Sequence, residues 1–98
     1  MIYEWDEAKR AANLHKHGLD FADADLVLES DYVLIVDSER KGEARKQAFA
    51  YVFDVLTVLT VAFVSGEERC RIVSFRQAKR KERENYYAWL EKDYRDDQ

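Results

Sequence analysis

The sequence has no proline, only three glycines and a single cysteine among its 98 residues. Without proline- or glycine-rich stretches there is no candidate linker, and a chain of this length supplies one hydrophobic core. We therefore predict a single domain over residues 1–98, with 95–98 as a frayed tail. Cys70 cannot form an internal disulfide, and without clustered His and Cys partners it does not indicate a structural zinc site.

Long apolar runs are also missing. The longest run covers residues 55–64, includes two threonines, and is about half as long as a membrane helix requires. Residues 1–7 have neither the basic start nor the apolar stretch of a secretory signal. We therefore expect a cytoplasmic protein that does not contact a membrane.

Charge is distributed unevenly along the chain. The formal net charge is −4, yet residues 69–83 contain seven Lys or Arg against one Glu, and residues 20–31 contain five acids and no base. Local potential, rather than net charge, determines whether a polyanion can dock. The basic segment is therefore compatible with a nucleic-acid partner.

Hydrophobic periodicity and capping residues predict an α+β domain. We expect two short N-terminal helices, one between Asp6 and Gly18 and one from Asp20 to about Glu29, and a long C-terminal helix over 78–94. Tight turns favour a four-stranded antiparallel sheet with the helices on one side. Its strands are expected at residues 32–36, 45–53, 55–64 and 70–75.

Arginines in the last strand could contact phosphate. The two-residue period of a strand places four side chains on one face: Arg69, Arg71, Val73 and Phe75. Arginine can donate two parallel hydrogen bonds to a phosphate. This face is therefore a candidate RNA-binding surface.

A second group of cations follows at helical spacing. Arg76, Arg80, Arg83 and Tyr87 stand at i, i+4, i+7 and i+11, and Lys79 belongs to the same basic segment. Arginines next to an aromatic ring suit phosphates and unpaired bases. The alternative is a solvated helix face whose arginines pair with Glu82 and Glu84.

Two further groups could transfer protons. His15, Lys16 and His17 end the first helix, where cations also stabilise the helix dipole without any catalytic role. Glu43 and Arg45 stand two residues apart at the start of a predicted strand, where they could face the same side as a catalytic pair or as a surface salt bridge. The sequence has no phosphate-binding glycine loop, nucleophile elbow or metal-ligand spacing, so we expect neither a metal nor a cofactor.

Four ordered blocks of residues between 2 and about 87 resemble the BrnT family of toxins. The blocks are Glu4-Trp5-Asp6 with Lys9 and Asn13; residues 16–21 with Ala24; Glu43 with Arg45; and residues 71–78 with Glu82, Arg83 and Tyr86. The sequence departs from the family's usual pattern at Ala50-Tyr51 and at Phe75. A ring at residue 75 is expected to narrow the groove beside the arginines.

The resemblance implies a metal-independent endoribonuclease of a type II toxin-antitoxin pair, with a compact RelE-like fold. It also implies a BrnA-like ribbon-helix-helix antitoxin, which neutralises the toxin and through which the pair binds DNA to repress its operon.

In this interpretation the phosphate is stabilised by Arg71 and Arg76, with Arg45 as a third cation. Protons are transferred by Lys16, His17 or Glu43. Flanking RNA is held by Lys79, Arg80, Arg83 and Tyr87. Two alternatives stay open: a non-catalytic basic module that docks an acidic partner or nucleic acid, and a scaffold that dimerises through its aromatic surface.

Overall fold

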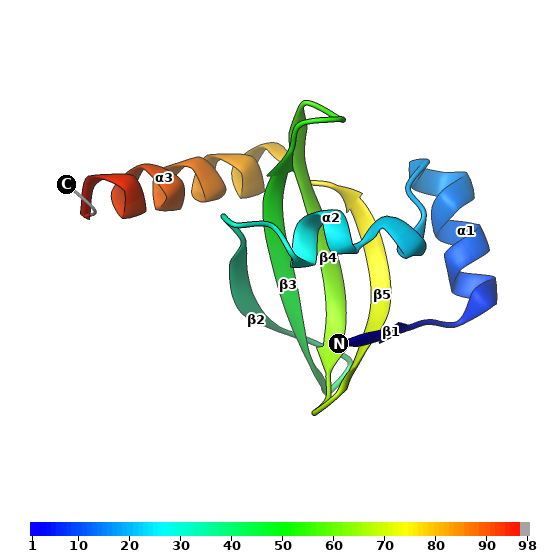
Figure 1. Cartoon of the computed structure of the whole chain (residues 1–98). Coiled ribbons are helices and arrows are strands. Elements are labelled where there is room, and N and C mark those ends of the chain that lie inside the picture. The colour runs from blue at the N-terminus through cyan, green and yellow to red at the C-terminus, as the bar shows by residue number, and fades with distance from the viewer. Residues whose placement is uncertain (97–98) are drawn as a thin grey trace.

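The computed structural model describes residues 1–96 and contains one five-stranded sheet with three α-helices (Figure 1). Its elements in chain order are β1 (Ile2–Glu4), α1 (Glu7–His17), a 3-10 turn η1 (Phe21–Asp23), α2 (Asp25–Leu28), β2 (Leu34–Arg40), β3 (Glu43–Val52), β4 (Thr57–Ser65), β5 (Arg69–Gln77) and α3 (Arg80–Asp96). The strand order is β1-β5-β4-β3-β2.

The sheet is mixed, so the prediction of four antiparallel strands was wrong. β1 pairs in parallel with β5, while the other three pairings are antiparallel. A strand of three residues is too short to show an alternating pattern, and its position is fixed by pairing with residues far away in the sequence, starting with Ile2 opposite Arg69. Local sequence therefore gives no indication of this strand.

The second predicted helix also differs from the structure. Residues 20–29 form the 3-10 turn η1 and then the four-residue α2, rather than one continuous helix. Their buried side chains, Phe21, Ala24 and Val27, recur every three residues. A three-residue spacing lies on one face of either helix type, so the apolar pattern does not distinguish a 3-10 turn from an α-helix.

Helix α1 begins and ends where its capping residues predict. The Asp6 carboxylate accepts hydrogen bonds from the backbone N–H groups of Ala8 and Lys9, and Gly18 adopts the left-handed conformation with φ of 70°. These two caps fix both ends of the helix.

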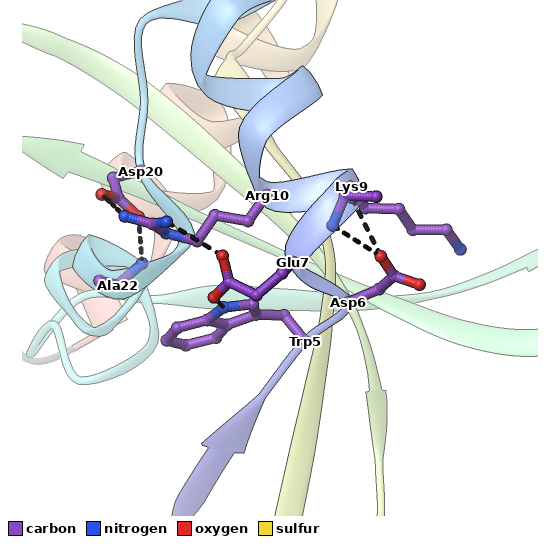
Figure 2. Close-up of polar contacts among 8 residues, drawn as sticks. Trp5, Asp6, Glu7, Lys9, Arg10, Asp20 and Ala22 are labelled. Carbon is purple, nitrogen blue, oxygen red and sulfur yellow. Dashed lines mark hydrogen bonds and ion pairs between the residues drawn. The ribbon is translucent and has the colours of Figure 1, made fainter.

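Polar contacts tie α1 to the following turn (Figure 2). Arg10 donates from Nε and Nη2 to the two carboxylate oxygens of Asp20, at 2.7 and 2.8 Å. Glu7 accepts from Arg10 and from the Trp5 indole N–H. The same Asp20 carboxylate accepts from the backbone N–H of Ala22, so it caps η1 as well.

The two faces of the sheet carry separate apolar clusters, so the expectation that all helices lie on one side was wrong. One face packs against η1 and α2, which lie across β3 and β4 in Figure 1. Its buried residues are Phe21, Ala24, Val27, Ala48, Ala50, Val52, Leu59, Val61, Phe63, Cys70, Ile72 and Phe75. The other face packs against the first turns of α3, through Phe49, Val58, Ala78 and Tyr86.

A β-bulge in β5 changes which residues share a face. Ala62 pairs with Ser74 but Phe63 pairs with Ile72, which leaves Val73 as an extra residue. Phe75 is therefore buried on the η1 and α2 face with Ile72. The prediction that Phe75 shares a face with Arg71 was wrong, and its ring does not narrow a groove beside the arginines.

Because of the bulge, Arg71 and Arg76 lie on the same face of the sheet although they stand five positions apart, an odd spacing that would place them on opposite faces of a regular strand. Arg76 also lies within β5 and not on the final helix, so it does not continue the stripe of Arg80, Arg83 and Tyr87. We call the face of β3, β4 and β5 that carries Arg71 and Arg76 the arginine face.

Two remaining expectations concern the ends of the chain and the membrane. Helix α3 extends through Asp96, and of the predicted frayed tail at 95–98, residues 97–98 lie outside the described residues. Within residues 1–96, none of the helices combines the length and apolar character needed to span a bilayer.

Candidate functional site

Glu43 forms an ion-pair cluster with two arginines at one end of the arginine face. Its Oε1 accepts from Arg45 Nε and its Oε2 accepts from Arg71 Nη2, both at 2.9 Å. Glu43 and Arg45 come from β3 and Arg71 comes from β5, so the cluster reaches across the intervening β4. We call these three residues the Glu43 cluster.

The two guanidinium groups keep the Glu43 carboxylate ionised. The hydrogen bond from Arg45 and the charge of Arg71 hold the pKa of Glu43 below its usual range, although partial burial opposes this effect. The predicted Glu43–Arg45 pair is therefore present, and the structure adds Arg71 to it. That addition depends on strand register, which the sequence does not reveal.

Arg76 occupies the other end of the arginine face, where β5 leads into α3. Its Nη1 and Nη2 donate to the two carboxylate oxygens of Glu82 at 2.8 and 3.1 Å, and Nη1 also donates to the carbonyl of Gln77. Glu82 in turn accepts from the backbone N–H of Lys79, which caps the start of α3. Hydrogen bonding by Arg76 is the main reason that the pKa of Glu82 is lowered.

One edge of the Arg76 guanidinium stays available. Within residues 1–96, its Nε–H and its second Nη2–H have no hydrogen-bond partner. Two such N–H groups form a fork that fits two oxygens of a phosphate. Glu82 thus fixes the orientation of Arg76 while leaving this fork free.

His17, half-buried at the C-terminal end of α1, is near enough to Arg76 for the charge of that guanidinium to lower the pKa of the imidazole. Desolvation, the neighbouring charge of Lys16 and the charge of Arg76 all lower the pKa of His17 below 6.5. The lowered pKa favours the neutral imidazole, the form that can accept a proton. His15 and Lys16, in the same turn, are exposed.

The buried side chain of Asn13 fastens α1 beside Arg76. Its Nδ2 donates to the carbonyl oxygens of Phe75 at 2.8 Å and Leu19 at 3.0 Å, and its Oδ1 accepts from the backbone N–H of Phe75 at 3.1 Å. Sequence reasoning gave this residue no role of its own. One sequence signal could have pointed to Asn13, which stands midway between Arg10 and His17 on a short amphipathic helix. A buried asparagine on such a helix needs hydrogen-bond partners, and backbone groups supply them.

The predicted RNA-binding residues of α3 are only partly free to bind. Arg83 is half-buried and donates to the carbonyl of Ala78 at 2.7 Å, and exposed Arg80 pairs with Glu84 at 3.3 Å. Lys79 and Tyr87 are exposed. The alternative of arginines paired with Glu82 and Glu84 therefore describes Arg76 and Arg80, whereas Arg83 is held by a backbone carbonyl.

The site is extended and open. Arg71 and Arg76 stand five positions apart along β5, or roughly 15 Å at the usual rise of a strand. The Glu43 cluster and the Arg76–His17 pair therefore cannot act on a single small anion. Among the described residues, no three His, Cys, Asp or Glu side chains are grouped so that they could hold a metal ion.

Together, these features define an α+β domain whose arginine face suits a chain of phosphates. A comparison with protein-family models matches residues 5–82 to the family described as "Ribonuclease toxin, BrnT, of type II toxin-antitoxin system". The match covers most of the chain, and the chain belongs to this family, which confirms the resemblance seen in the sequence. A comparison with curated proteins found no match. The family indicates a toxin with ribonuclease activity, an RNA target and an antitoxin partner.

Proposed function

We propose that this chain is a metal-independent endoribonuclease that acts in the cytoplasm, cleaves RNA and thereby inhibits translation and growth. Membership of the ribonuclease toxin family supports the activity. The observation that carries the mechanism is the free fork of Arg76 beside the neutral imidazole of His17.

Cleavage without a metal uses the 2′-hydroxyl of the RNA as the nucleophile. The 2′-oxygen attacks phosphorus and loses its proton to a base, the bond from phosphorus to the 5′-oxygen breaks, and that oxygen takes up a proton. The products are a 2′,3′-cyclic phosphate and a free 5′-hydroxyl. The protein must supply a base, an acid and donors for the negative charge of the transition state.

The residues around Arg76 can meet these requirements. Neutral His17 accepts the proton of the 2′-hydroxyl, and the Arg76 fork donates to the phosphate oxygens as their charge increases. Lys16, exposed in the same turn as His17, can donate a proton to the leaving 5′-oxygen.

The Glu43 cluster binds the neighbouring part of the substrate in this proposal. Arg45 and Arg71 contact a flanking phosphate, while Glu43 positions both guanidinium groups through its two carboxylate oxygens. The exposed Lys79, Arg80 and Tyr87 extend the contact to further nucleotides.

We further propose that the antitoxin is a BrnA-like ribbon-helix-helix protein and that the pair binds DNA through it. The support is the family's pairing with an antitoxin. Sequencing the DNA on both sides of the gene tests this proposal, because a short neighbouring open reading frame should encode such a protein.

Incubation of the purified chain with RNA and EDTA tests the proposed activity. We expect cleavage to persist, to yield 2′,3′-cyclic phosphate ends, and to be lost in Arg76→Ala but not in Lys46→Ala, a control at an exposed cation on the opposite face of β3. Cleavage that stops on chelation would exclude the metal-free mechanism. Binding without cleavage would favour a non-catalytic basic module that docks an acidic partner or nucleic acid.

A further inference from the structure

Large apolar side chains are exposed at the loop between β3 and β4. Phe53 is 80% exposed and Leu56 is 74% exposed, and Figure 1 shows the loop projecting beyond the helices that cover the sheet. Leu56 has φ of 59°, which is unfavourable for a branched side chain. An exposed apolar loop of this kind is typical of an interaction surface.

A groove of about 350 Å³ lies between this loop and the end of α2. Leu26, Glu29 and Asp31 line one side, and Tyr51, Phe53 and Asp54 line the other. Pairing between β2 and β3 begins only at Leu34 opposite Phe49, so the groove runs beside the part of β3 that β2 does not cover. We call this the loop groove.

The loop groove combines apolar and negatively charged groups. Glu29, Asp31 and Asp54 line it, Lys and Arg do not, and the adjoining segment 20–31 contains five acids and no base. The Tyr3 hydroxyl donates a hydrogen bond to the Glu29 carboxylate at 3.1 Å. A complementary partner therefore carries an apolar side chain flanked by Lys or Arg.

Other occupants fit less well. The phosphates of RNA would be repelled by the acidic rim. A second copy of this chain, related by a two-fold axis, would bring the same acidic residues face to face. Charge complementarity thus favours a basic protein segment.

We propose that the loop groove is the docking site for a basic, apolar-anchored segment of the antitoxin. This inference rests on the antitoxin pairing proposed above, and it adds the place on the toxin where the antitoxin binds. The groove lies at the same end of the sheet as Arg76, because Val52 pairs with Thr57 at the start of β4 and Arg76 pairs with Thr60 in the same part of that strand. An antitoxin anchored there would lie at the end of the sheet that carries Arg76.

Titration calorimetry with the protein encoded by the neighbouring antitoxin gene tests the proposal. We expect Phe53→Ser to raise the dissociation constant at least about tenfold. Asp54→Lys should do the same and weaken the salt dependence of binding. Ile35→Ser, an exposed apolar position on β2, and Glu67→Lys, an exposed acid in the β4–β5 turn, are the matched controls and should bind as the wild type does.

RNA cleavage by the same variants separates this proposal from the proposed activity. We expect Phe53→Ser and Asp54→Lys to cleave RNA at the wild-type rate. Unchanged antitoxin affinity in both variants would overturn the docking site and leave the ribonuclease proposal intact. Reduced RNA cleavage with unchanged antitoxin affinity would assign the groove to RNA instead.

Two further outcomes would also overturn the proposed docking site. Wild-type self-association that disappears in Phe53→Ser, measured by analytical ultracentrifugation, would identify a second copy of the chain as the occupant. Failure of the wild type to bind the antitoxin would remove both the pairing and the docking site, while RNA cleavage would still report separately on the activity.

Discussion

The side-chain amide of Asn13 makes both backbone hydrogen bonds of Phe75, donating to its carbonyl oxygen and accepting from its N–H. An adjacent strand would normally make these bonds, but β1 pairs only with residues 69–71 of β5. Asn13 thus makes the hydrogen bonds that a neighbouring strand would make at the edge of β5. It makes them to Phe75, the residue directly before Arg76. It joins α1, and with it His17, to the arginine face.

Asn13→Ala should destabilise the protein by about 2 to 3 kcal/mol, because it leaves buried backbone groups of Phe75 without partners. Urea denaturation followed by circular dichroism measures this loss. Asn85→Ala, at an exposed position of α3, is the control and should change stability by less than about 0.5 kcal/mol. Similar stability of Asn13→Ala and wild type would show that water replaces the amide at no cost.

Arg76→Lys should reduce RNA cleavage at least about 100-fold, because lysine keeps the charge but loses the fork that contacts phosphate. Loss of the bonds to Glu82 and Gln77 should also destabilise the protein, by about 1 to 2 kcal/mol. Single-turnover cleavage and thermal unfolding measure the two effects. Near-normal cleavage by Arg76→Lys would mean that the positive charge at this position, rather than the guanidinium fork, stabilises the phosphate.

The cleavage rate should rise with pH through the pKa of His17, which lies below 6.5, and then level off. The sign follows from the base mechanism, in which only the neutral imidazole accepts the proton. Lys16→Met removes one of the positive charges that lower this pKa, so the acid limb should move to higher pH, while loss of the proposed proton donor should lower the plateau rate. The pH profile of single-turnover cleavage measures the shift, and an acid limb that persists in His17→Gln would assign the titration to another group.

Arg71→Gln should weaken RNA binding and reduce the slope of its logarithmic salt dependence by about one, as expected for the loss of one phosphate contact. Fluorescence anisotropy with a 2′-deoxy oligonucleotide, which cannot be cleaved, measures binding alone. Lys46→Gln removes a cation from the opposite face of β3, where Lys46 pairs with Phe63, and should leave the slope unchanged. Equal effects of the two substitutions would indicate general attraction rather than a specific contact.

Parts of the fold that depend on neighbouring residues were predictable. Asp6 and Gly18 mark the ends of α1, and the alternation of Gln47, Phe49 and Tyr51 with alanines and Val52 distinguishes the two faces of β3. Parts that depend on distant residues were not. The bulge at Val73 and the pairing of β1 with β5 arise from the packing of the complete sheet.

The candidate site was likewise predictable from the sequence only in part. Glu43 and Arg45 were identified as a pair because a strand places them two residues apart on one face. The contact of Glu43 with Arg71 requires the register of three strands, and the contact of Arg76 with Glu82 requires the angle at which α3 leaves β5. Sequence therefore indicated most of the charged residues but not their partners.

The parallel pairing of Ile2 with Arg69 also constrains the order in which the protein can fold during synthesis. β1 leaves the ribosome first and has no neighbour until β5 has been translated, a delay of several seconds at ordinary elongation rates. Arg71 and Arg76 belong to that same late strand. A nascent chain thus carries Glu43 and His17 well before it carries the guanidinium groups beside them, so the ribosome that makes this toxin does not meet an assembled arginine face until β5 emerges.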